Sequence, residues 1–208
     1  MMKRKIVSAL LVLLMAFSLS GCTLGSKYTE KKAAKFYEKE LEGEEMDVDD
    51  FLDGLDNGSA RKYEDGAWTY LDKKQTKNAY SSLGMNMYFA SVKKAESSVA
   101  YLYSKDAKSG HKATFVMTLT FDDKKDIDEF FEESMEVWED MKDIYSDYKI
   151  GEGENKMLFW GEDGGNDFYL AAYRNGKNVL LFICVNNDST VSHICDYFEL
   201  VTPVDMPA

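Results

Sequence analysis

Residues 167–185 read DFYLAAYRNGKNVLLFICV, and this stretch decides how the chain can fold. Two apolar runs flank the pair Asn175-Gly176, which favours the left-handed backbone of a two-residue type I′ turn. The stretch therefore predicts a β-hairpin with strands at 167–174 and 178–185. A hairpin of this kind indicates an antiparallel sheet.

Further strands and helices are indicated on both sides of the hairpin. Short apolar or alternating runs predict strands at 67–71, 85–89, 99–104, 113–121, 148–151 and 157–161. Apolar residues at helical spacing predict helices at 29–41, 48–55, 125–145 and 189–200. No Pro-rich or Gly/Ser-rich linker interrupts this region, so we expect one α+β domain over residues 27–202. It would comprise an antiparallel sheet with packed helices and a helical N-terminal lead-in.

The ends of this domain are marked by composition. The only prolines, Pro203 and Pro207, follow the last predicted helix and predict an extended tail over 203–208 that cannot continue it. Within the domain, residues 115–137 and 179–201 share an apolar pattern at an offset of 64. Two interpretations are open, a duplicated strand-strand-helix unit and a chance match.

The N-terminus carries an apolar run that is too short to span a membrane. Three basic residues precede the run at 6–19, whereas a spanning helix needs about 20 apolar residues. A basic start, an apolar middle and a small-residue exit are typical of an export signal. The exit Leu19-Ser20-Gly21-Cys22 resembles the lipobox of bacterial lipoproteins. The resemblance implies that residues 1–21 are removed and that Cys22 begins the mature chain with a thioether-linked diacylglyceryl group.

This resemblance implies an anchored protein. Residues 22–26 would be the lipidated cysteine and a short tether, and the domain would sit on the extracytoplasmic side of the cell membrane. The membrane, reached through the lipid on Cys22, is then the expected partner, because two or more acyl chains hold a protein stably. An ordinary secretory signal followed by a chance cysteine, or an uncleaved anchor, are the alternatives.

The charge of the mature chain limits its partners. Without residues 1–21 the chain keeps 22 basic and 37 acidic residues, a net charge of −15. Such a surface repels phosphate backbones and anionic lipid headgroups, so we expect no nucleic acid partner and no flat adhesion to the membrane. Cationic or metal-bridged partners stay open, and the charge can also serve solubility alone.

Two cysteines remain after Cys22, and an exported protein can pair them. Cys184 lies near the end of a predicted strand and Cys195 lies on the apolar face of the following helix. If the helix folds back along the strand, the two reach similar heights and could form a disulfide. In the comparison of residues 115–137 with 179–201, however, Cys184 is equivalent to Thr120, which is expected to point away from the following helix. This places Cys184 on the far face of the sheet from Cys195 and favours two separate buried thiols.

No metal, cofactor or catalytic site is expected from the sequence. His193 and Cys195 are two apart on a helix and point in nearly opposite directions. An EF-hand frame starting at Asp53 places Gly58 and Glu64 correctly, but Leu55 occupies a position that requires an oxygen. A Ser-x-x-Lys match at 91–94 lacks the companion motifs of the penicillin-binding enzymes.

Aromatic pairs are the remaining hint of function. Trp68 and Tyr70 alternate on one predicted strand, as do Tyr101 and Tyr103 on another. Aromatic residues spaced by two share a sheet face, which can stack on a sugar, grip a peptide or pack into the core.

The sequence therefore favours a membrane-anchored, non-enzymatic binding or interaction module. The alternative is a cell-envelope hydrolase that uses carboxylates on glycan or peptide. Beyond the lipobox, the domain resembles only small envelope lipoproteins, and that loose likeness implies no activity.

Overall fold

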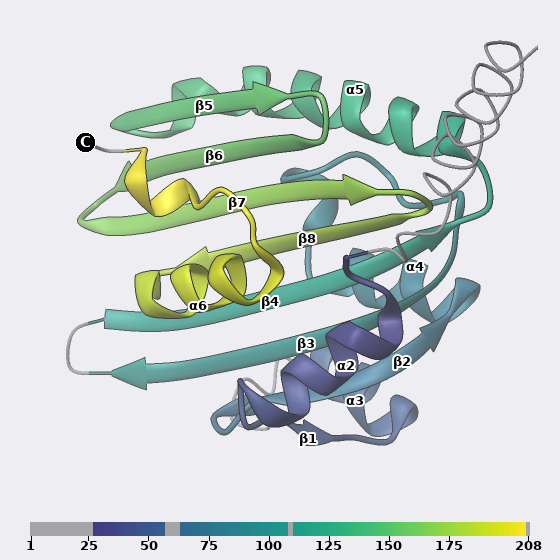
Figure 1. Cartoon of the computed structure of the whole chain (residues 1–208). Helices are drawn as coiled ribbons and strands as arrows, with labels where there is room; N and C mark the ends of the chain where they lie inside the picture. The colour runs from purple at the N-terminus through teal and green to yellow at the C-terminus, as the bar shows by residue number, and fades with distance from the viewer. Residues whose placement is uncertain (1–26, 57–62, 108–109, 207–208) are drawn as a thin grey trace, which may run out of the picture.

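The protein is described by a computed structural model over residues 27–56, 63–107 and 110–206. The predicted α+β class is confirmed by one eight-stranded sheet, mostly antiparallel, with the order β1-β2-β3-β4-β8-β7-β6-β5 (Figure 1). The strands are β1 (Glu44–Glu45), β2 (Ala67–Asp72), β3 (Ala95–Ala107), β4 (Gly110–Phe121), β5 (Asp147–Gly153), β6 (Lys156–Asp163), β7 (Asn166–Asn175) and β8 (Asn178–Val185).

Helices cover both faces of the sheet. One face carries α2 (Glu30–Lys39) and α6 (Asp188–Phe198), and the other carries α3 (Val48–Asp56), α4 (Lys73–Ser82) and α5 (Lys124–Met141). Strand β8 therefore packs against a hydrophobic core on each side, with Leu181 in one core and Phe182 in the other. This double burial explains why the opening stretch is continuously apolar and does not alternate.

The hairpin predicted at 167–185 is confirmed, but its turn lies one residue later than expected. Asn175 pairs with Asn178, so Gly176 and Lys177 form the two-residue loop. Only Gly176 has a positive φ, +64°, which fits a type II′ turn because type I′ requires positive φ at both central residues. The type I′ pattern occurs instead at Gly164 and Gly165, whose φ values are +59° and +80°.

The strand predicted at 85–89 is wrong. Residues Met85–Met87 form a 3-10 turn, η3, and Met85 and Phe89 are both buried four residues apart. Helix α5 holds this segment: Ala90 N donates to Ser134 Oγ at 2.9 Å and Trp138 Nε1 donates to the Tyr88 carbonyl. Met85 and Phe89 are therefore both buried by a tight turn, whereas Met87 between them is exposed.

The duplication is not confirmed. The equivalent strand positions Leu119 and Ile183 do lie on the same sheet face. The helices that follow do not keep this equivalence, because α5 packs on that face and α6 packs on the opposite one. The shared pattern thus reflects two strands buried in a similar way.

Residues after α6 pack back onto the sheet. Pro203–Asp205 form a 3-10 turn, η5, in which Pro203 is buried and Thr202 accepts a hydrogen bond from Val204 N. Val204 and Met206 contact the same core as α6.

Across the residues that the structure describes, no helix has the length and apolar character needed to cross a membrane. The predicted signal peptide, Cys22 and the tether at 22–26 lie outside the described residues.

Candidate functional site

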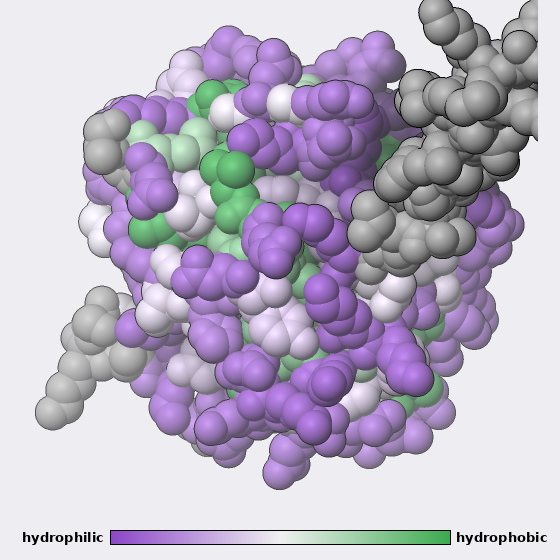
Figure 2. Space-filling view, in the orientation of Figure 1, coloured by the Kyte–Doolittle hydropathy of each residue, from purple (hydrophilic) through white to green (hydrophobic). Residues whose placement is uncertain are grey.

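A groove opens between the C-terminal end of α2 and the N-terminal end of α6. Its volume is about 500 Å³, within the range of small-molecule sites. Tyr101, Tyr103 and Thr114 form its floor, and the rim carries Glu40, Glu42, Glu64 and Asp65. We call it the tyrosine groove. Figure 2 shows that the face on which it opens is covered mainly by hydrophilic residues.

Tyr101 is held rigidly in the floor. Its side chain is 3% exposed, and its ring centroid lies 5.4 Å from that of Tyr37 on α2. Two glycines approach the ring so closely that a Cβ would lie 2.8 Å from it at Gly43 and 2.6 Å from its hydroxyl at Gly66. Burial raises the pKa of the Tyr101 phenol well above its usual value, so this hydroxyl stays protonated. Tyr103, two residues along the strand, is only half-buried and is available to a ligand.

The far wall is built where β8 passes into α6. Asn187 begins this helix and is buried, and its Nδ2 donates to Thr114 Oγ1 at 2.8 Å. Thr114 pairs across the sheet with Cys184, which places the Cys184 thiol beneath the groove. These buried bonds fix the floor in place before a ligand arrives.

The rim is strongly acidic. Its four carboxylates come from the end of α2 and from the loop before β2, and all four are exposed. Glu40 Oε2 lies 3.5 Å from His193 Nε2 on α6, so this contact bridges the two helices. Among the residues lining the groove, Lys112 is the one lysine or arginine. The groove therefore presents tyrosine rings surrounded by negative charge.

Such a site is suited to binding more than to acid-base chemistry. A glycosidase-type acid is a carboxyl group whose pKa is raised by a buried environment. The carboxylates of the tyrosine groove are solvated at the rim, and its buried polar groups are one phenol, one hydroxyl and one amide. This arrangement does not favour the hydrolase alternative.

The two cysteines are separate buried thiols in the structure, and no disulfide joins them. The predicted placement of Cys184 on the far face from Cys195 is wrong, because α6 packs on the face that Cys184 occupies and both cysteines therefore lie in the same core. Burial raises the pKa of Cys184 to about 12 and that of Cys195 to about 11. Thiols with such pKa values are poor nucleophiles at neutral pH, which indicates a packing role.

The two histidines lie at separate places, and the calcium frame is described only in part. His111 Nδ1 lies 3.0 Å from Asp106 Oδ1 at the surface. The described residues contain no cluster of three or more His, Cys, Asp or Glu side chains placed to hold a metal ion. Asp53 and Leu55 of the calcium frame lie on α3, whereas positions 57–62 fall outside the described residues.

In the Ser-x-x-Lys match at 91–94, the structure does not support Lys94 as the base that would activate Ser91 as a nucleophile. Lys94 instead makes ion pairs with Asp126, at 2.9 Å, and with Glu129 on α5. Hydrogen bonds to these carboxylates raise the pKa of Lys94, which is the opposite of what a lysine base requires.

The aromatic pairs separate into core and groove. Trp68 is buried while Tyr70 is 44% exposed. Tyr101 and Tyr103 line the tyrosine groove together. The rim carboxylates were not predicted, because acids from two distant segments meet only through the fold and carry no local signal.

Comparisons with known proteins identify no family for this chain. No protein-family model matches the chain, and no curated protein matches it significantly. One similar solved structure is that of a GTP binding regulator from Thermotoga maritima, 16% identical over 53% of this chain and 72% of that chain, with a TM-score of 0.31. A likeness at this level carries no argument about function.

Proposed function

We propose that this protein is a non-enzymatic binding module, held at the extracytoplasmic face of the cell membrane by lipid on Cys22, that binds its ligand in the tyrosine groove. The observation that carries this proposal is the position of the groove relative to the point where the chain runs toward Cys22. That point lies beside the start of β8, because Lys27 N donates at 3.2 Å to Oδ1 of Asn175, which pairs with the first residue of β8.

The groove lies beyond the other end of the same strand. Asn187 and Thr190 line it, just after β8 ends at Val185. The eight residues of β8 span about 26 Å at strand rise. An anchor at one end of the sheet would thus leave the groove directed away from the bilayer and open to a ligand.

The chemistry of the groove favours a ligand with positive charge. An ammonium group gains from the faces of tyrosine rings and from nearby carboxylates. Tyr103 offers the accessible ring, and the rim supplies four carboxylates against one lysine. A small amine or a lysine-bearing peptide is the class of ligand that these groups recognise.

Calorimetric titration of the mature protein with the peptide tri-lysine tests the groove. We expect binding with a dissociation constant in the millimolar range or tighter, weakened at least about fivefold by Tyr103→Ala. The matched control is Tyr148→Ala, which removes a tyrosine that is 39% exposed on the edge strand β5 and should leave binding unchanged. An absence of binding, or equal losses in both variants, would refute the groove as the cationic site.

A further inference from the structure

Three donor groups in the tyrosine groove have no side-chain partner among the described residues. One is the hydroxyl of Tyr101, on a side chain that is 3% exposed. The others are the ammonium group of Lys112 and the hydroxyl of Thr190, two half-buried residues that line the same groove. Polar groups on buried side chains normally have a hydrogen-bond partner, so these donors are available to a ligand that carries acceptors.

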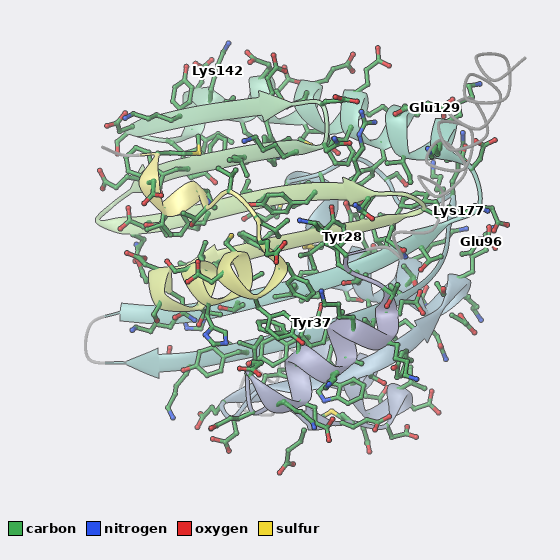
Figure 3. The ribbon with its side chains drawn as sticks, viewed as in Figure 1. Tyr28, Tyr37, Glu96, Glu129, Lys142 and Lys177 are labelled. Atoms are coloured by element: carbon green, nitrogen blue, oxygen red, sulfur yellow. The ribbon has the colours of Figure 1, made fainter. Side chains whose placement is uncertain are left out.

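The surroundings of Tyr101 explain why its hydroxyl stays open. Figure 3 shows Tyr37 between α2 and α6, on the face where the groove lies. The Tyr37 ring packs beside that of Tyr101, but the Tyr37 hydroxyl lies 3.5 Å from Thr118 Oγ1 instead. Gly66, close to the Tyr101 hydroxyl, has no side chain to offer. Because burial raises its pKa, the Tyr101 phenol stays protonated and keeps a donor for the ligand.

Lys112 gives the groove a second pole. It lies on β4 beside the N-terminal end of α6, whereas the rim carboxylates come from the end of α2 and from the loop before β2. Within the described part of the chain it forms no salt bridge, although four carboxylates line the same groove. Two further acids near it have other partners. Asp106 lies 3.0 Å from His111, and Asp188 in the first turn of α6 interacts with Tyr169.

The spacing along the floor sets the size of the ligand. Tyr101 pairs with Val116 across the sheet, and Lys112 lies four residues before Val116 on the same strand. At strand rise, the two positions are about 13 Å apart along the strands. An extended peptide covers this distance with about three or four residues, whereas a single amino acid is too short.

We propose that the tyrosine groove binds a short lysine-bearing peptide at both poles, with the C-terminal carboxylate held by Lys112 and Thr190 and the ammonium groups held by the rim carboxylates. This inference rests on the proposed function and adds a carboxylate to the ligand. The Tyr101 hydroxyl then donates to a carbonyl of the peptide, and the Tyr103 ring faces an ammonium group. A charge-assisted bond from Lys112 to the carboxylate fixes the direction in which the peptide lies.

Calorimetric titration with tri-lysine and with its C-terminal amide tests this inference. The amide carries one more positive charge, so attraction to an acidic groove alone would make it the tighter ligand. We expect the opposite order, with the free acid binding at least about fivefold more tightly. Lys112→Gln should remove this preference by weakening the free acid. Lys105→Gln is the matched control, because Lys105 is exposed and pairs with Lys112 across the sheet but does not line the groove.

The Tyr101 hydroxyl is tested with the same two peptides. Tyr101→Phe removes no hydrogen bond within the described residues, so the variant should fold. It should weaken both peptides about threefold and leave their ratio unchanged. Wild-type affinity in Tyr101→Phe would contradict the contact with the peptide carbonyl.

The outcomes separate this inference from the proposed function. If neither peptide binds, both fail. If both bind and the amide binds as tightly as the free acid or more tightly, the groove stays the cationic site and the inference is overturned. A preference for the free acid that survives Lys112→Gln, or that Lys105→Gln removes equally, would overturn it as well.

Discussion

Tyr101 shows how a single side chain positions the groove. The alternation of Tyr101 and Tyr103 predicted that they share a sheet face, and the structure confirms it. Their surroundings were not predictable, because Gly43 and Gly66 approach Tyr101 from segments far away in the sequence. Local spacing determines which face a residue occupies, whereas the partners on that face depend on the topology.

Replacing Gly66 with Ala should destabilise the protein. Gly66 has a φ of +83°, and a Cβ there would lie 2.6 Å from the Tyr101 hydroxyl. Left-handed strain of 1–2 kcal/mol and overpacking of 1–3 kcal/mol together predict a loss of about 3 kcal/mol in the free energy of unfolding. Urea unfolding measures it. Gly164→Ala is the control, since its φ is +59° with nothing within 4 Å, and a comparable loss there would contradict the role of contact with Tyr101.

Thiol counting tests the state of the cysteines. Because Cys184 and Cys195 are separate and buried, denatured, unreduced mature protein should show two free thiols. The native protein should react far more slowly with the same reagent, since both pKa values are raised by burial. Fewer than two thiols after denaturation would show that the pair had formed a disulfide.

Stability should fall at alkaline pH. Burial raises the pKa of Tyr37 and of Tyr101 above the value of about 10 that they have when unfolded. Their contribution is complete below pH 10 and is lost above it, because the unfolded state then releases protons that the folded state retains. Each phenol should lower the free energy of unfolding by about 1.4 kcal/mol per pH unit above pH 10. Tyr37→Phe should reduce this slope, and an unchanged slope would contradict the assignment.

Among the elements, those with a long, regular apolar pattern were predicted well. The helices at 29–41 and 48–55 and the final hairpin are present within a few residues of their expected bounds. The strand prediction at 85–89 was wrong because a five-residue mixture of apolar and polar residues is equally compatible with a strand and with a tight turn. What decides between them is contact with α5, which lies more than forty residues away and leaves no trace in the local pattern.

Removing the Ser134 hydroxyl should loosen this segment. Ser134 is fully buried, and its Oγ accepts the hydrogen bond from Ala90 N. Ser134→Ala leaves that amide without a partner, which costs about 1–3 kcal/mol. Thermal unfolding should show the loss, together with faster hydrogen exchange at Ala90. Ser91→Ala, at an exposed neighbouring position, should change neither, and an equal effect there would rule out the hydrogen bond as the cause.

For the molecule as a whole, the sequence predicted the fold class but not the arrangement of the helices. Placing α6 on the face opposite α5 creates the space between α2 and α6 in which the groove lies. The rim carboxylates also meet only through this arrangement, because they come from the end of α2 and from the loop before β2.

The anchor on Cys22 is the claim on which the orientation depends, and the mass of the N-terminal peptide tests it most directly. Protein isolated from the membrane fraction should begin at Cys22 and carry a diacylglyceryl mass on that residue, and the Cys22→Ala variant should lose the mass and leave the membrane fraction. A mature chain whose Cys22 is unmodified, or membrane retention unchanged in Cys22→Ala, would contradict the account.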